Sequence, residues 1–169
     1  MNIRPAHPED LVDITAIYGR SVEEEFASFE LYPPTVEDMT SRYHAIVEGG
    51  YPYLVALVDG KVAGYCYASA YRPRPAYAST VENTVYVNPD YWRRGVATGL
   101  LTELISACRA SGFRQMIAIA SCRPDAEPHQ ISSVRFHASL GFELKGRLHR
   151  VGNKHDLWLD VILMQLSLE

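Results

Sequence analysis

One segment, residues 80–101, limits the possible folds more than any other part of the chain. It begins as an alternating strand and continues through a turn, Trp92-Arg93-Arg94-Gly95-Val96-Ala97, into a helix from about Gly95 to Ala110. A turn with small residues that leads into a helix N-terminus offers several backbone N–H groups and the positive end of the helix dipole. The segment therefore predicts an anion site that suits a pyrophosphate, with Arg93 and Arg94 adding positive charge.

A simpler interpretation of this turn is that both arginines are solvated and that Gly95 only allows a tight bend. The dinucleotide-binding fingerprint is absent, and so is the phosphate loop that ends in Gly-Lys-Ser/Thr. The chemistry of the turn alone leaves both interpretations open.

Periodicity and turn signals predict the remaining elements. They are helices from near Pro8 and from Thr35, strands 53–58, 61–71 and 116–120, a helix 132–140, and strands 142–149 and 155–166 around a turn at 151–153. In the strand 61–71, Val62 is expected on the same face as Cys66 and Ala68. The order β-α-α-β-β-β-α-β-α-β-β is neither pure βαβ alternation nor all-β. It predicts an α/β fold of the α+β type, with a mixed sheet and helices on both faces.

Length and composition predict one globular domain, residues 1–169. Hydrophobic residues make up 47% and charged residues 21% of the chain, an ordinary balance for a globular protein. The net charge of −4 argues against nucleic acid as a partner. No apolar run approaches the roughly 20 residues that a membrane span needs. Three cysteines without a Cys-x-x-Cys pair favour a reducing compartment, so we expect a cytoplasmic protein without a metal site.

The segment that begins at Val85 resembles the acetyl-CoA-binding segment of the GNAT superfamily of N-acetyltransferases. Gly95 and Ala97 match the family pattern Gln/Arg-x-x-Gly-x-Gly/Ala, whereas Trp92 stands where Gln or Arg is usual. A second block, residues 133–142, resembles the helix that flanks the pantetheine arm and ends at Gly-Phe. The resemblance implies a GNAT fold with acetyl-CoA as co-substrate. The residues that it places on acetyl-CoA are Val85, Tyr86, Val87, Arg93, Arg94, Gly95, Val96, Ala97 and Thr98.

Within the superfamily, nearly the whole chain resembles the branch of phosphinothricin and methionine sulfone/sulfoximine acetyltransferases. The matching stretches are residues 51–56, 76–87 and 152–160. This resemblance implies a small amino-acid-like amine as substrate and a homodimer. It also implies substrate contacts from Phe29, Arg74 and Tyr77, and a guanidinium such as that of Arg72 can bind a carboxylate or phosphinate through two hydrogen bonds. Without the family, Arg72 and Arg74 are more simply interpreted as solvated loop charges.

Glu82 is the candidate general base. Acetyl transfer needs a neutral amine, whereas an α-amino group has a pKa near 8 and is mostly protonated at pH 7. A carboxylate beside the thioester can remove that proton directly or through water. Glu82 lies on the predicted strand 80–87, opposite the face of Val81 and Val85, and it matches the base proposed for the family. The alternative is an ordinary glutamate that faces solvent.

His137 is the candidate acid for the departing thiolate. Many GNAT enzymes place a tyrosine at this point of the helix, and the phosphinothricin branch resembles this chain in having histidine there. The alternative is a structural histidine that bonds a backbone carbonyl.

Together these residues predict an N-acetyltransferase in which the amine attacks the thioester directly in a ternary complex. No cysteine stands where it could carry the acetyl group. Two alternatives stay open: a protein or peptide N-terminal acetyltransferase, which needs an open groove, and a non-catalytic acyl-CoA-binding sensor, which would lack a base.

Overall fold

The computed structural model describes all residues, 1–169, as one mixed seven-stranded sheet with four α-helices. The elements are β1 (Asn2–Pro5), α1 (Leu11–Glu24), α2 (Val36–Glu48), β2 (Tyr53–Val58), β3 (Lys61–Ala70), β4 (Thr80–Val87), α3 (Val96–Ala110), β5 (Gln115–Cys122), α4 (Ser132–Ser139), β6 (Glu143–Lys154) and β7 (Leu157–Ser167). This order is the one that the sequence predicts. No helix is both long enough and apolar enough to cross a bilayer.

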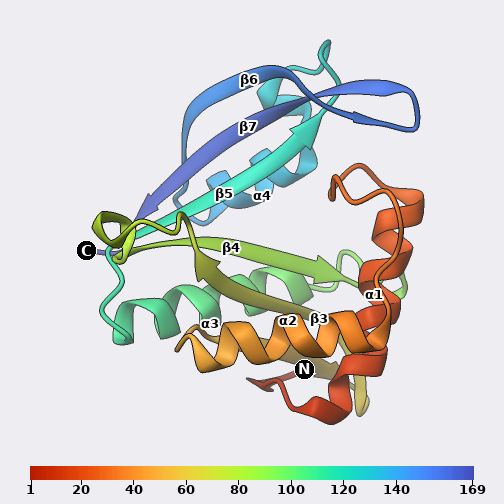
Figure 1. Ribbon diagram of the computed structural model, residues 1–169, viewed down its shortest axis with the longest axis vertical. Helices are drawn as coiled ribbons and strands as arrows, with labels where there is room; N and C mark the ends of the chain where they lie inside the picture. Colours follow the sequence, from red (N-terminus) through yellow and green to blue (C-terminus); the bar gives the residue numbers. More distant parts are fainter.

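The strands follow the order β1-β2-β3-β4-β5-β7-β6 across the sheet. Neighbouring strands are antiparallel except β4 and β5, which are parallel. Figure 1 shows these two central strands close together at one end and well apart at the other, so that the sheet opens into two halves. The open end positions the site described below.

Two apolar cores cover opposite faces of the sheet. The first contains buried residues of α3 and α4 packed on Val81 of β4 and Met116 of β5. The second contains buried residues of α1 and α2 packed on Tyr65 of β3, with Tyr86 of β4 against it. Alternate residues of β4 therefore face different helix layers, as the predicted alternation of the strand requires.

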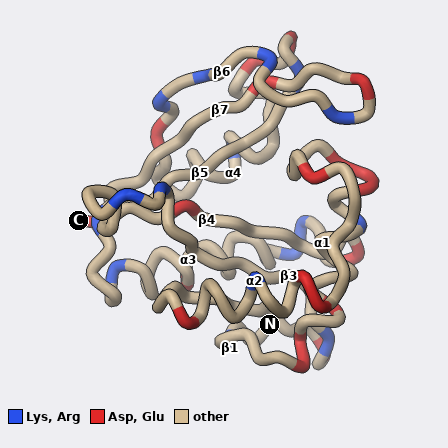
Figure 2. Tube along the Cα trace, in the orientation of Figure 1, with Lys and Arg blue, Asp and Glu red and all other residues tan.

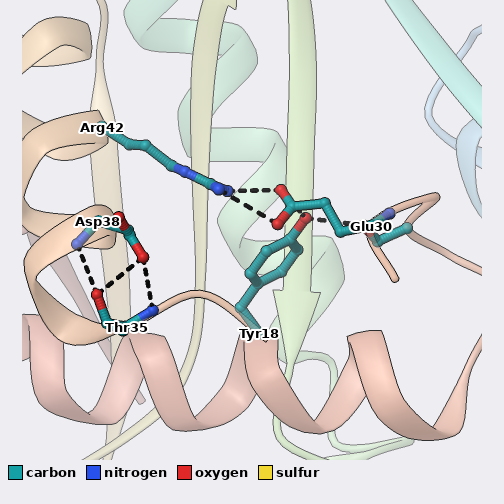
Figure 3. Close-up of polar contacts among 6 residues, drawn as sticks. Tyr18, Glu30, Thr35, Asp38 and Arg42 are labelled. Carbon is teal, nitrogen blue, oxygen red and sulfur yellow. Dashed lines mark hydrogen bonds and ion pairs between the residues drawn. The ribbon is translucent and has the colours of Figure 1, made fainter. Parts of the chain in front are cut away.

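Sequence signals explain where the helices begin and end. Thr35 caps α2, and the side chains and backbones of Thr35 and Asp38 exchange hydrogen bonds in a capping box (Figure 3). The apolar side of α3 is buried through Val96, Leu100, Leu104 and Cys108, and the helix stops before Gly112, whose φ of 83° favours glycine. The three cysteines are buried and free.

Two predictions of local structure are wrong. Ala63 has no partner in the β2–β3 register, and this bulge turns Val62 into the core of Tyr65 and away from the core of Cys66. The last hairpin turns at His155-Asp156, both with positive φ, whereas residues 151–153 belong to β6. The reason is a bulge before Gly152, where the Asp160 carboxylate of β7 accepts the backbone N–H of Arg150 at 2.8 Å.

Candidate active site

The site lies where β4 and β5 separate. The two strands pair only from Thr80 to Glu82 on β4 and from Gln115 to Ile117 on β5. Beyond Glu82 the strands diverge, and a cleft of about 540 Å³ opens between them. The edge of β4 that faces β5 has no strand partner there, so its backbone N–H and C=O groups are available to a ligand.

Glu82 occupies the last paired position before this opening. Its side chain lines the cleft on the face of β4 opposite Val81, as predicted. Glu82 is half-buried, and burial raises the pKa of its carboxyl above the usual value, an effect that the positive charge of Arg72 opposes. A carboxylate with a raised pKa is a better proton acceptor than one in water, which suits a general base.

His137 reaches the same cleft from α4, on the other face of β4. Its Nδ1–H donates to the carbonyl oxygen of Ser133 at 2.8 Å, and its Nε2 lies 3.2 Å from Oδ1 of Asn83. The ring is buried against Phe136 and Phe142, and this burial lowers the pKa of His137. The hydrogen bond to a backbone carbonyl, which is expected of a purely structural histidine, is therefore present. The imidazole nevertheless also faces the cleft.

The predicted phosphate turn lies beyond the end of β4. Trp92 folds back, so that its indole N–H donates to the carbonyl of Val87 at 3.0 Å. Gly95 has a φ of 77°, and the space that a Cβ would occupy there is empty. The first backbone hydrogen bond of α3 runs from Gly99 to Gly95 at 2.9 Å. The N–H groups of residues 96–98 precede this bond, which leaves them free for an anion.

The predicted substrate residues do not all meet at the cleft. Phe29 lines it, in the segment that follows α1. Arg72, Arg74 and Tyr77 lie in the exposed β3–β4 loop and are not among the residues that line the cleft. Figure 2 shows the basic residues of this loop beside the beginnings of β4 and β5. They are therefore close to the Glu82 end of the cleft but outside it.

A wall of the cleft, residues 25–29, was not predicted from the sequence apart from Phe29. This cleft wall is fixed by contacts from distant strands: Lys154 Nζ donates to the carbonyls of Glu25 and Ser28 at 2.8 and 2.7 Å, and Ser121 Oγ donates to the carbonyl of Phe26. No local sequence signal identifies these partners. A buried lysine at the end of a strand is visible only in the fold.

A second group of contacts fixes the chain just after the cleft wall. The hydroxyl of Tyr18 lies 2.8 Å from Ser28 Oγ and donates to Glu30, and Arg42 of α2 donates to both oxygens of Glu30 (Figure 3). The ion pair lowers the pKa of Glu30, although partial burial acts in the opposite direction. The segment between α1 and α2 is thus held from both helices.

The comparisons with known proteins agree with this geometry. The pattern of the Acetyltransferase (GNAT) family matches residues 17–142, and the chain belongs to this family. It is similar to a phosphinothricin N-acetyltransferase of Alcaligenes faecalis, with 42% identity over 98% of this chain and 82% of that protein. It is also similar to an L-methionine sulfoximine/L-methionine sulfone acetyltransferase of Pseudomonas paraeruginosa, with 36% identity over 99% of this chain and 95% of that protein.

A solved structure gives the same result for the fold. The crystal structure of a GNAT superfamily phosphinothricin acetyltransferase from Sinorhizobium meliloti, in complex with acetyl-CoA, superposes with a TM-score of 0.91. The two chains are 42% identical, and the match covers 98% of this chain and 87% of that one. The predicted GNAT fold and the predicted resemblance to the phosphinothricin branch are confirmed.

Proposed function

We propose that this protein transfers the acetyl group of acetyl-CoA to the amino group of a small amino-acid-like substrate, such as phosphinothricin, methionine sulfone or methionine sulfoximine. One observation carries the proposal. Glu82 and His137 reach one cleft from opposite faces of β4, at the point where the central strands separate. A proton acceptor for the amine and a proton donor for the thiolate therefore flank the place where a thioester can enter the sheet.

The open edge of β4 and the turn after it suit acetyl-CoA. Beyond Glu82, the edge of β4 that faces β5 offers backbone groups, such as those of Val85, to the amides of the pantetheine arm, as a missing strand would, whereas the carbonyl of Val87 already accepts from Trp92. The turn from Arg93 to Thr98 offers backbone N–H groups, the helix dipole and two guanidinium groups to the pyrophosphate. The missing family side chain at Trp92 leaves this backbone cradle intact, because the indole points back to Val87.

The reaction then needs one proton removed and one supplied. Glu82 accepts a proton from the substrate ammonium, directly or through water, and the neutral amine attacks the thioester carbon. The C–N bond forms as the C–S bond breaks, and the thiolate takes a proton from His137. The buried Cys66 and Cys108 carry no acetyl group, because burial raises the pKa of each thiol and neither lines the cleft.

Substrate recognition is assigned to Phe29 inside the cleft and to Arg72, Arg74 and Tyr77 at its Glu82 end. The cleft is lined by no Lys or Arg side chain. We assign the cation for an acidic group of the substrate to the β3–β4 loop, while the amine of the substrate points towards Glu82. A thiol-release assay over free amino acids, their sulfone, sulfoximine and phosphinate analogues, and peptides tests this assignment. A higher kcat/KM for peptides would favour the N-terminal acetyltransferase instead.

The decisive variant is Glu82→Gln, which keeps the size of the side chain but cannot accept a proton. Loss of a general base costs about a hundred- to ten-thousand-fold in rate, so we expect kcat/KM for the amine to fall at least about a hundredfold near neutral pH. Stabilisation by acetyl-CoA should not change. Raising the pH should restore part of the rate, because more of the amine is then neutral without help.

Glu103→Gln is the matched control, since Glu103 is exposed on α3 and makes no ion pair. It should leave the kinetics unchanged. A Glu82→Gln enzyme with a normal rate and pH profile would exclude Glu82 as the base. Acetyl-CoA binding by the unaltered protein, without thiol release for any amine, would support the acyl-CoA sensor.

A further inference from the structure

Asn83 is a buried polar residue on the apolar face of β4, between Val81 and Val85. Its backbone pairs with Ala68 of β3, and its side chain occupies the first position at which β5 no longer pairs. The carboxamide bridges the opening: Nδ2 donates to the carbonyl of Ile117 on β5 at 3.0 Å, and Oδ1 faces Nε2 of His137 at 3.2 Å.

These contacts fix the direction of each hydrogen bond. A carbonyl oxygen only accepts, so the Asn83 amide must present its NH₂ group to Ile117 and its oxygen to His137. The carbonyl of Ser133 likewise requires the proton on Nδ1 of His137. Both ring nitrogens therefore face acceptors. Only the imidazolium, with a proton on each nitrogen, satisfies both contacts, whereas the neutral ring with its proton on Nδ1 sets the Nε2 lone pair against Oδ1 of Asn83.

We propose that Asn83 is a positioning residue, which keeps a transferable proton on Nε2 of His137 and directs that nitrogen to the split between β4 and β5. This assignment rests on the proposed transferase function. In the thiolate-forming step the Nε2–H bond breaks, its electron pair stays on nitrogen, and the proton bonds to the CoA sulfur. The resulting contact between the Nε2 lone pair and Oδ1 is unfavourable, which helps His137 to take up a proton again before the next turnover.

Among the groups around His137, Asn83 is the one that contacts Nε2. The ring packs against Phe136 and Phe142, and its recorded polar contacts are Ser133 and Asn83. The other titratable side chains that line the cleft are Glu25, Glu82, Tyr18, Tyr67 and Tyr86. Burial favours the neutral ring and lowers the pKa of His137. The acceptor that Asn83 supplies opposes this effect, since hydrogen bonding to the charged form favours that form.

Two substitutions at Asn83 should shift the protonation of His137 in opposite directions. Asn83→Leu removes the acceptor, and loss of a hydrogen bond to a charged group should move the midpoint of His137 protonation down by about one pH unit or more. Asn83→Asp is nearly isosteric and places a carboxylate at Nε2, so the midpoint should rise. Asn2→Leu makes the same chemical change on the exposed edge strand β1 and should leave the midpoint unchanged.

The measurement is a pH titration of the ring ¹⁵N signals in the full-length protein, with the His137 signals assigned by their loss in His137→Gln. Equal midpoints in the unaltered protein, Asn83→Leu and Asn83→Asp would overturn the proposal. If Asn83→Leu does not fold, the upward shift in Asn83→Asp alone decides the result. This titration needs no turnover, so it stands even if the protein transfers no acetyl group.

Kinetics give the second measurement. A general acid must be protonated to act, so kcat falls as the pH rises above the pKa of that acid. Asn83→Leu should move this alkaline limb to lower pH and reduce kcat at pH 8 by about tenfold for each pH unit of movement. Stabilisation by acetyl-CoA should stay unchanged. A uniform loss of kcat without movement of the limb would mean that Asn83 is only structural.

Discussion

Gly95 allows a sharp test of the phosphate turn, because the fold provides a matched control. Gly95 and Gly60 have φ angles of 77° and 76°, and in both cases no atom lies within 4 Å of the position that a Cβ would take. Alanine at either position meets no steric obstacle in the protein. The only expected cost is that of holding alanine in the left-handed backbone conformation, about 1–2 kcal/mol. For a chain of this size, that loss lowers the Tm by about 2–8 °C.

The two variants should differ in their response to acetyl-CoA. A ligand present at 100 times its Kd stabilises the folded state by about 2.7 kcal/mol, which raises the Tm by about 5–11 °C. Gly60→Ala should keep this increase, because Gly60 lies in the β2–β3 turn. In Gly95→Ala the new methyl group occupies the space beside the free N–H groups of α3. A hundredfold weaker Kd would leave only about 0.4 kcal/mol, or about 1 °C.

Thermal unfolding with and without acetyl-CoA measures both quantities in one experiment. The unliganded Tm reports the backbone strain, and the increase on adding acetyl-CoA reports the cradle. An equal increase in Gly95→Ala and Gly60→Ala would refute the placement of the pyrophosphate at this turn. A much larger fall of the unliganded Tm in Gly95→Ala than in Gly60→Ala would show that Gly95 has a packing role that its empty surroundings do not predict.

Two further substitutions test the cleft through stability. Lys154→Met leaves the carbonyls of Glu25 and Ser28 without their donor, which costs about 1–3 kcal/mol for each unsatisfied group. Thermal unfolding should therefore show a lower Tm. Steady-state kinetics should show a higher KM for the amine. An unchanged KM would show that the cleft wall keeps its shape without Lys154. Burial raises the pKa of Glu82, so the stability linked to that carboxyl is complete below its ordinary pKa and is lost as the pH rises through the raised value. Glu82→Gln should therefore have a higher Tm than the unaltered protein at pH 7–8 and a similar Tm below about pH 4; a constant difference across this range would contradict the linkage.

Local signals made most of the fold predictable. The element order follows from apolar periodicity, from the cap at Thr35 and from the hairpin residues Asp59-Gly60, all of which act over a few neighbouring positions. The position of Val62 and the last turn were not predictable, because each depends on a bulge. The bulge in β6 is fixed by Asp160, a buried carboxylate of β7 that also accepts from Arg147 and His149. Contacts of this kind, between residues on different strands, produce no periodic pattern in the sequence.

The site, like the fold, was predictable where local patterns determine it and was not predictable where contacts between distant residues determine it. Strand alternation was enough to place Glu82 opposite Val81, and the resemblance of residues 133–142 to the family helix was enough to place His137 beside the expected path of the pantetheine arm. The cleft wall depends on Lys154, which bonds Ser28 across 126 positions of the chain. Asn83 could have been noticed as a polar residue on an apolar strand face, although its partners could not. Arg72, Arg74 and Tyr77 lie outside the cleft lining. The substrate contacts that the family resemblance implies for these residues therefore agree less closely with the geometry of the cleft.

In the proposed mechanism, the split between β4 and β5 lets the base and the acid share one cleft without neutralising each other. On a continuous sheet, neighbouring residues such as Glu82 and Asn83 point to opposite faces, and groups on those faces are separated by the backbone. The split opens that barrier at one place only. The proposed base Glu82 lies on the side of α1, while the proposed acid His137, in contact with Asn83, lies on the side of α4. A carboxylate at the amine nitrogen and an imidazolium at the thiolate sulfur can thus serve the same acetyl transfer without forming an ion pair, and each can keep the protonation state that its own step requires.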